Sequence, residues 1–169
     1  MTVFKKLVVV AIGAVSLVGA GSGTALAHES PRLLEFNSMT PVTGAAVGTV
    51  NHRGITGGGL PWAIASGRGS VTANGEVEVT VKGLVIPVAP FNGTNPVPLF
   101  GAIVSCISSG GSIVNVSTKL FPANLAGDST IEDTVVLPNP CKHALLFVVS
   151  PGPNAAWFSR SNPRDHEGD

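Results

Sequence analysis

The stretch that most restricts the fold is NGEVEVTVK, residues 74–82, in which valine alternates strictly with polar residues. Val77, Val79 and Val81 are spaced two apart, so in an extended strand their side chains share one face. Glutamate, threonine and lysine fall on the other face, which predicts a strand with one buried and one wet side. The preceding Asn74-Gly75 favours a type I′ turn, so residues 69–73 are expected to form the partner strand of a hairpin.

Six further runs have strand-like composition and are bounded by Gly, Pro, Asn or Ser: LPWAIAS, LFGAIVSCI, SIVNVSTKLF, STIEDTVVL, HALLFVVS and AAWFS. We find no convincing helical period, and parallel strands need long crossovers, so antiparallel pairing is expected. The predicted fold class is all-β: a single antiparallel β-sandwich, or barrel-like, domain. The segment VIPVAPFNGTNPVP, residues 85–98, is too rich in proline for a central strand. It is predicted to be the longest loop and the binding surface.

The first 27 residues have the layout of a signal peptide. Lys5 and Lys6 precede an apolar run that ends near Ala20, and Ala25-Leu26-Ala27 fits the cleavage rule of signal peptidase. The run is shorter than the ~20 residues that span a bilayer. We therefore predict a signal peptide at 1–27, an exported domain at 28–160 and a flexible polar tail at 161–169. The mature protein is expected to be secreted and not attached to a membrane.

Charge argues against two classes of partner. Two of the ten Lys and Arg residues lie in the signal peptide, which leaves 8 − 10 = −2 for the mature chain with histidine neutral. The remaining basic residues are scattered singly along the chain. Nucleic acids and anionic membranes require clustered Lys and Arg, so neither is an expected partner. The low charged fraction of 12%, with 21 Gly and 13 Pro, suits strands joined by tight turns.

Both cysteines, Cys106 and Cys141, fall in the exported part, where thiols normally end as disulfides. We predict that they pair with each other. The alternative, two thiolates that hold a metal, would need further ligands at close spacing, and His143 alone is a poor complement.

A set of short motifs resembles a group of uncharacterised small exported proteins of actinobacterial type. The motifs are FNSMTPVTG, GGGLPW, NGEVEVTVKGLVI, AIVSC, FPANLAGDSTIE, LPNPC and WFS, and they run from Phe36 to Phe158. Members of that group carry Ala-Pro after the second cysteine, whereas Lys142-His143 stands here. The resemblance implies export, β structure and a cysteine pair, and it implies no activity and no site.

His28 would be the first mature residue if cleavage follows Ala27. Its amino nitrogen and imidazole could then chelate copper, with His52 or His143 as a second ligand, in an arrangement similar to the histidine brace of copper monooxygenases. Under this hypothesis His28 and His143 are the candidate metal ligands and copper is the cofactor. The alternative is that His28 is simply a mobile first residue.

Other motifs have structural explanations. Gly57, Gly58 and Gly59 in GGGLPW are attributed to turn geometry, because the strand that follows does not suit a phosphate-binding loop. Trp62 and Trp157 are expected in the core. Glu76 and Glu78 share the wet face of the hairpin.

No catalytic residues are assigned, because no nucleophile elbow is present and Glu132 and Asp133 should face opposite sides of a strand. The sequence therefore favours a non-enzymatic exported domain with a structural or binding role toward an extracellular ligand or a cell-wall component. A copper protein and a secreted hydrolase with dispersed catalytic residues are the alternatives.

Overall fold

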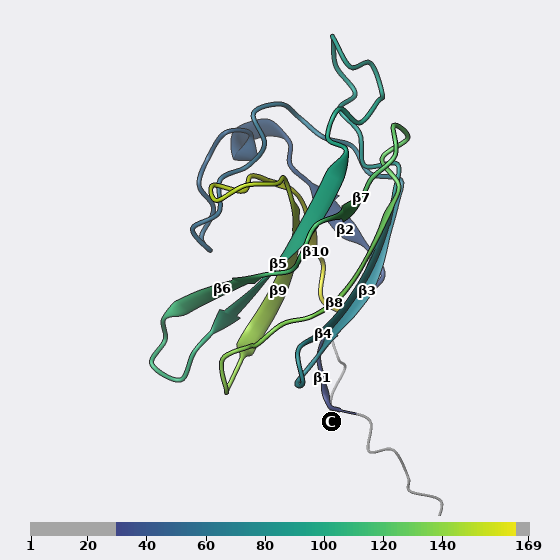
Figure 1. The fold of residues 1–169 in the computed structure, drawn as a ribbon. Coiled ribbons are helices and arrows are strands. Elements are labelled where there is room, and N and C mark those ends of the chain that lie inside the picture. Colours follow the sequence, from purple (N-terminus) through teal and green to yellow (C-terminus); the bar gives the residue numbers. More distant parts are fainter. Residues whose placement is uncertain (1–29, 165–169) are drawn as a thin grey trace, which may run out of the picture.

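The computed structural model describes residues 30–164, which form two antiparallel sheets packed face to face (Figure 1). The first sheet has the order β1 (Arg32–Phe36), β3 (Ser66–Thr72), β4 (Glu76–Lys82) and β8 (Ser129–Thr134). The second has the order β2 (Met39–Pro41), β10 (Trp157–Ser161), β9 (Lys142–Val149), β5 (Leu99–Ile107) and β6 (Ile113–Ser117), with β7 (Phe121–Pro122) paired to β5. The predicted all-β sandwich is confirmed.

The hairpin of β3 and β4 has the predicted facing. Val77, Val79 and Val81 are each at most 2% exposed, whereas Glu76, Glu78 and Lys82 are exposed. The predicted type I′ turn is wrong, because Asn74 is not among the residues with positive φ and only Gly75 has one, at 83°. The amide of Gly75 donates to the carbonyl of Thr72 over 3.0 Å. The connection is thus a three-residue loop that ends in a left-handed glycine, the next commonest hairpin type.

Aromatic rings fill the interior near one end of the sandwich. Trp62 stacks on Phe158 with ring centroids 4.0 Å apart, and Phe100 meets Phe158 edge-on at 5.7 Å. Trp157 packs edge-on against Phe147. Both tryptophans are less than 5% exposed, so their expected place in the core is confirmed.

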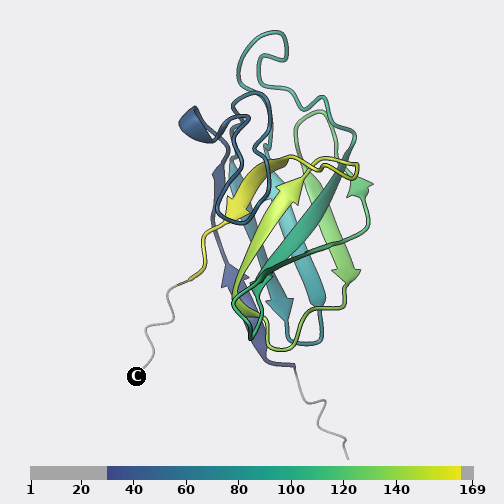
Figure 2. The ribbon, with the colours of Figure 1, turned by 90° about the vertical axis from the view of Figure 1, so that its left-hand side faces the viewer.

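Consecutive Trp157 and Phe158 are both buried because β10 is covered on both faces. A register shift against β9 separates Trp157 from Ser159. Residues 42–59, which include the 3-10 turn η1 (Gly44–Ala46), lie over the outside of the second sheet (Figure 2). Their contacts include a bond from the Gly58 amide to the Trp157 carbonyl and a bridge between Gly57 and Trp157.

The segment LPWAIAS is not a strand, which corrects the sequence prediction: Trp62 packs in the aromatic interior, and Ala63 and Ala65 bond to Val85 and Lys82 at the end of β4. Within it only Ala63 makes a bridge, to Val85, before β3 begins at Ser66. Residues 42–65 also form a longer irregular stretch than residues 85–98.

The glycines of GGGLPW have a different role from the one expected. None of Gly57, Gly58 and Gly59 has a positive φ. A Cβ on Gly57 would meet the carbonyl of Ala46, and one on Gly58 would lie 2.9 Å from Nε1 of Trp62. Close packing, and not turn geometry, therefore requires glycine at positions 57 and 58.

The two cysteines are joined between the neighbouring strands β5 and β9 of the second sheet. Cys106 lies in β5 and Cys141 directly precedes β9, as the sequence indicated, and they form a disulfide that spans 35 residues.

The C-terminal stretch is held to the domain as far as it is described. β10 extends to Ser161, whose hydroxyl oxygen accepts the amide of Leu146 over 3.0 Å, and the amide of Arg164 donates to the carbonyl of Glu35. The predicted signal peptide and residues 165–169 of the predicted tail lie outside the described residues. No helix in the described part of the chain is long and apolar enough to cross a membrane.

Candidate functional site: the polar face of the first sheet

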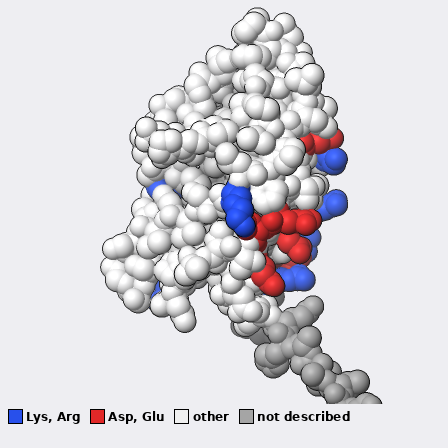
Figure 3. Space-filling model, in the orientation of Figure 1, with Lys and Arg blue, Asp and Glu red and all other residues white. Residues whose placement is uncertain are grey.

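The charged side chains gather on the outer face of the first sheet (Figure 3). We call this surface the polar face; its charged members are Arg32, Glu35, Arg68, Glu76, Glu78, Lys82 and Glu132. No charged residue occurs between Lys82 and Lys119, so the loop at 85–98 and the turn between β5 and β6 carry none. Charge is therefore concentrated on one side of the molecule.

A bulge in β1 places two charges of β1 on this face. Arg32 lies opposite Thr72, but Leu34 lies opposite Val71, so Leu33 is an extra residue. Arg32 and Glu35, three positions apart, consequently face the same way. The carboxylate of Glu35 is bound by Arg32 at 3.1 Å and by Arg164, which follows β10, at 3.1 Å.

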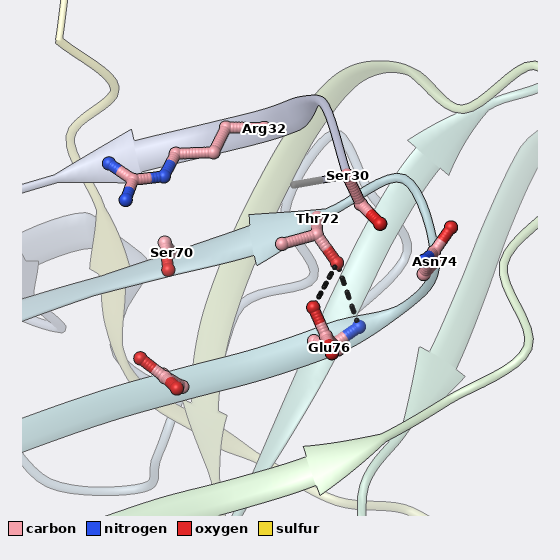
Figure 4. Close-up of a pocket in the computed structure, with 7 residues that line it drawn as sticks. Ser30, Arg32, Ser70, Thr72, Asn74 and Glu76 are labelled. Atoms are coloured by element: carbon pink, nitrogen blue, oxygen red, sulfur yellow. Dashed lines mark hydrogen bonds between the residues drawn. The ribbon is translucent and has the colours of Figure 1, made fainter. Parts of the chain in front are cut away.

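The polar face contains a hollow of about 620 Å³ at the hairpin end (Figure 4). Its lining has no apolar side chain and consists of Ser30, Arg32, Ser70, Thr72, Asn74, Glu76 and Glu78. The hydroxyl of Thr72 donates to Oε2 of Glu76 and accepts the Glu76 amide, both over 3.2 Å. The hollow thus presents hydroxyl, amide, carboxylate and guanidinium groups together, which supply both donors and acceptors.

A second hollow, of about 300 Å³, continues the first along β3. The two share Arg32, Ser70 and Glu78, and the second reaches Arg68 and Asn37. The side chains from Thr72 to Arg68 span about 13 Å at the rise of a β-strand. The two hollows therefore form one polar groove along the sheet.

Two like charges stand directly opposite each other beside this groove. Glu78 of β4 pairs with Glu132 of β8 in the register of the sheet. Neither carboxylate, nor the guanidinium of Arg68, takes part in any of the four ion pairs found among residues 30–164. A directly opposed pair of carboxylates destabilises a sheet. The polar face therefore retains unneutralised charge on both sides of the groove.

Two aspartates near this sheet are structural. The backbone amide of Gly83, over 3.0 Å, and then the ammonium of Lys82, over 3.2 Å, lower the pKa of the Asp128 carboxyl. The backbone amide of Lys119, over 2.8 Å, is the main cause of the lowered pKa of Asp133. Both groups fix loop backbone to the ends of strands, so their hydrogen-bonding capacity is already used.

The loop at 85–98 is irregular, as predicted, and is fixed from within. The amide group of Asn95, which is 2% exposed, donates to the carbonyls of Val97 and Asn124 over 2.7 and 3.0 Å. The side-chain amide of Asn95 therefore already uses its hydrogen bonds within the protein and is not free to bind a ligand.

The histidines have no metal-binding arrangement among the described residues. His28 lies outside these residues, so the proposed brace remains a hypothesis. His52 and His143 are both exposed, and a hydrogen bond from the guanidinium of Arg53 to the carbonyl of His143 brings their segments together. Between residues 30 and 164 no three His, Cys, Asp or Glu side chains are grouped to hold an ion.

The sequence analysis did not identify this site, because it placed the binding surface at the loop 85–98. The alternation in β4 placed Glu76 and Glu78 on the wet face, but it gave no indication of Arg32, Arg68 or Ser70, which reach the groove through strand pairing. Comparisons with family models, curated proteins and solved structures gave no match to this chain.

Proposed function

We propose that this protein is a secreted, non-enzymatic binding domain whose polar groove recognises a polyhydroxylated ligand such as a cell-wall polysaccharide. The observation that carries the proposal is the lining of the groove: seven polar side chains of mixed type and no apolar one in its larger part. A sugar ring offers hydroxyl groups that both donate and accept hydrogen bonds, which matches this lining.

The balance of charge favours a neutral ligand. The larger hollow has Arg32 against Glu76 and Glu78, and the smaller one has Arg32, Arg68 and Arg164 against Glu35 and Glu78. The net charges are therefore 1 − 2 = −1 and 3 − 2 = +1. A uniformly anionic or cationic polymer would meet like charge at one end of the groove. A neutral polyol would meet donors and acceptors along its whole length.

The opposed carboxylates support a binding role over a purely structural one. Glu78 opposite Glu132 costs stability in the free protein, and hydroxyl donors from a ligand would offset that cost. The groove contains no aromatic platform, since both tryptophans are buried, so binding would rest on hydrogen bonds.

The experiment is a binding screen of the secreted protein against soluble bacterial cell-wall polysaccharides by isothermal titration calorimetry. Glu78→Gln and Ser70→Val should each weaken binding about tenfold, because each removes or blocks a polar contact in the groove. Lys142→Ala, at an exposed position of the second sheet, is the matched control and should bind like the wild type.

Unchanged affinity in a Ser70→Val/Glu78→Gln double variant would refute the groove as the site. Release of reducing sugar from any of the polysaccharides would instead show an enzyme and would contradict the proposed non-enzymatic role.

A further inference from the structure

A further hollow of about 340 Å³ lies between β1, the start of β9 and the stretch after β10, and it shares Glu35 and Arg164 with the smaller hollow of the polar groove. It differs from the polar groove in having apolar walls, which include Leu33, Leu145 and Pro163. Charged groups line it as well, namely Arg53, Arg164 and Glu35. Its volume is at the lower end of the range of small-molecule sites, and apolar walls with few polar groups are typical of such sites.

Arg53 is the unusual group in this lining. It is 6% exposed, and its guanidinium donates to the carbonyl of His143 over 2.8 Å and to the carbonyl of Ser105 over 3.4 Å. None of the four ion pairs among residues 30–164 includes it. Burial lowers the pKa of this guanidinium. Buried arginines are usually paired with an anion, so a covered cation without one is a costly arrangement.

The nearby carboxylate does not compensate Arg53. Glu35 is the acidic residue of the lining, and both of its oxygens are engaged, Oε2 by Arg32 and Oε1 by Arg164, each at 3.1 Å. Arg53 and Arg164 against Glu35 leave the lining with a net charge of 2 − 1 = +1. The hollow is therefore complementary to one negative charge.

The backbone beside Arg53 is held in an uncommon conformation. His143 has φ of 47°, in the left-handed region, which non-glycine residues seldom adopt. The carbonyl of this same residue accepts the 2.8 Å bond from Arg53. Strained backbone of this kind tends to occur at binding sites, where the surrounding structure maintains it.

We propose that this hollow binds a small organic carboxylate with an apolar body, its carboxylate at Arg53 and its body against Leu33, Leu145 and Pro163. A guanidinium matches a carboxylate in geometry and forms strong charge-assisted hydrogen bonds with it. One carboxylate supplies the one negative charge that the lining lacks. This ligand class differs from that of the polar groove, and the proposal does not depend on the proposed function.

The test uses three probes on the ¹⁵N-labelled secreted protein, observed by two-dimensional NMR. Octanoate carries both a charge and an apolar tail, 1-octanol has only the tail, and acetate has only the charge. Octanoate should cause saturable shifts in the amides of Leu33, Ala144 and Leu145, with Kd below about 1 mM. The other two probes should bind at least about tenfold more weakly.

Arg53→Met should lower the affinity for octanoate to that for octanol. Arg160→Met is the matched control, because Arg160 is an arginine of β10 that lines neither this hollow nor the polar groove. Arg53→Met removes buried hydrogen bonds and could unfold the domain, so Leu33→Ser provides a second test. Leu33 is the extra, half-buried residue of the β1 bulge, and its replacement should weaken octanoate binding severalfold with the spectrum otherwise preserved.

Equal affinity for octanoate and 1-octanol would overturn the proposal, as would octanoate shifts confined to other regions. A lack of saturable shifts up to about 10 mM octanoate would do the same, because a site of that weakness confers no selectivity. If the protein bound no polysaccharide, the proposed function would fail, but the test of octanoate binding would still stand.

Discussion

The indole ring of Trp62 lies over the phenyl ring of Phe158, with centroids 4.0 Å apart and 22° between the ring planes. Trp62 belongs to the irregular segment between β2 and β3, and Phe158 to β10. The stack thus fastens a long segment without regular strands to the second sheet. Trp62 is therefore part of the core, although its segment has no regular strand.

Trp62→Ala should lower the free energy of unfolding by about 3–5 kcal/mol, since it removes a buried aromatic ring and leaves a cavity. Leu125→Ala is the control: Leu125 is 75% exposed, and its loss should change stability by at most about 0.5 kcal/mol. Urea unfolding followed by circular dichroism measures both. A loss below about 1 kcal/mol for Trp62→Ala would contradict its place in the core.

The facing of β4 predicts opposite results at neighbouring positions. Val79 is 2% exposed, so Val79→Asp buries a carboxylate without a partner and should cost several kcal/mol. Thr80 lies on the polar face, opposite Arg68 of β3, so Thr80→Asp should change stability little. Thermal unfolding of the two variants gives the comparison. Equal losses would mean that the facing is wrong.

The disulfide between Cys106 and Cys141 should contribute about 3–4 kcal/mol through the 35-residue loop that it closes. Replacement of both cysteines by serine should lower the free energy of unfolding by that amount. Tryptic digestion without reduction should release peptide 83–119 joined to peptide 120–142, because Lys82, Lys119 and Lys142 bound these peptides. Two separate peptides in a digest of the secreted protein would contradict the pairing.

The lowered pKa of Asp128 predicts part of the loss of folding stability in acid. Its folded-state pKa lies below the ordinary value of 3.8, chiefly through the Gly83 amide, so its stabilising effect is complete above that value. The effect is lost as the pH falls through the lower folded-state pKa. Asp128→Asn should therefore lose less stability than the wild type between about pH 5 and pH 2, measured by urea unfolding. An unchanged pH dependence would show that the carboxylate is not held in this way.

The glycines of GGGLPW should differ sharply in their tolerance of a methyl group. A Cβ at Gly57 would overlap the carbonyl of Ala46, so Gly57→Ala should cost about 1–3 kcal/mol. A Cβ at Gly59 would meet no atom beyond its chain neighbours within 4 Å and φ is not positive, so Gly59→Ala should be neutral or slightly stabilising. Thermal unfolding distinguishes the two. Similar midpoints for both variants would rule out the close approach of the Gly57 backbone.

Alternation and turn residues were sufficient to predict most of the sheets. The hairpin of β3 and β4, and strands β5, β6, β8, β9 and β10, correspond to predicted runs. β1 and β2 were missed, because β2 is only three residues long and the bulge in β1 breaks the two-residue period. LPWAIAS was mistaken for a strand because Trp62 is buried in the aromatic core, while pairing in this segment is limited to the bridge between Ala63 and Val85.

The candidate sites were harder to predict from the sequence than the strands. Glu76 and Glu78 share a face by simple alternation, but Ser70 and Glu132 join them only through the register of two strand pairs. Arg53 lies between His52 and Gly54 with no pattern around it, and its burial depends on contacts with residues 52 and 90 positions away. Such long-range contacts leave no local signal.

The ties between the two ends of the described chain make the fold a candidate for circular permutation. Arg164 and Arg32 both bind the carboxylate of Glu35, and the amide of Asn162 donates to the carbonyl of Ser38. Because residue 164 lies beside Glu35, a linker from residue 164 to residue 30 would run back along β1 over about 17 Å, and a new opening at the exposed Gly110-Gly111 tip between β5 and β6 would break no strand. Every pairing of both sheets would survive the rearrangement, so the order in which the strands are synthesised is not what defines this architecture.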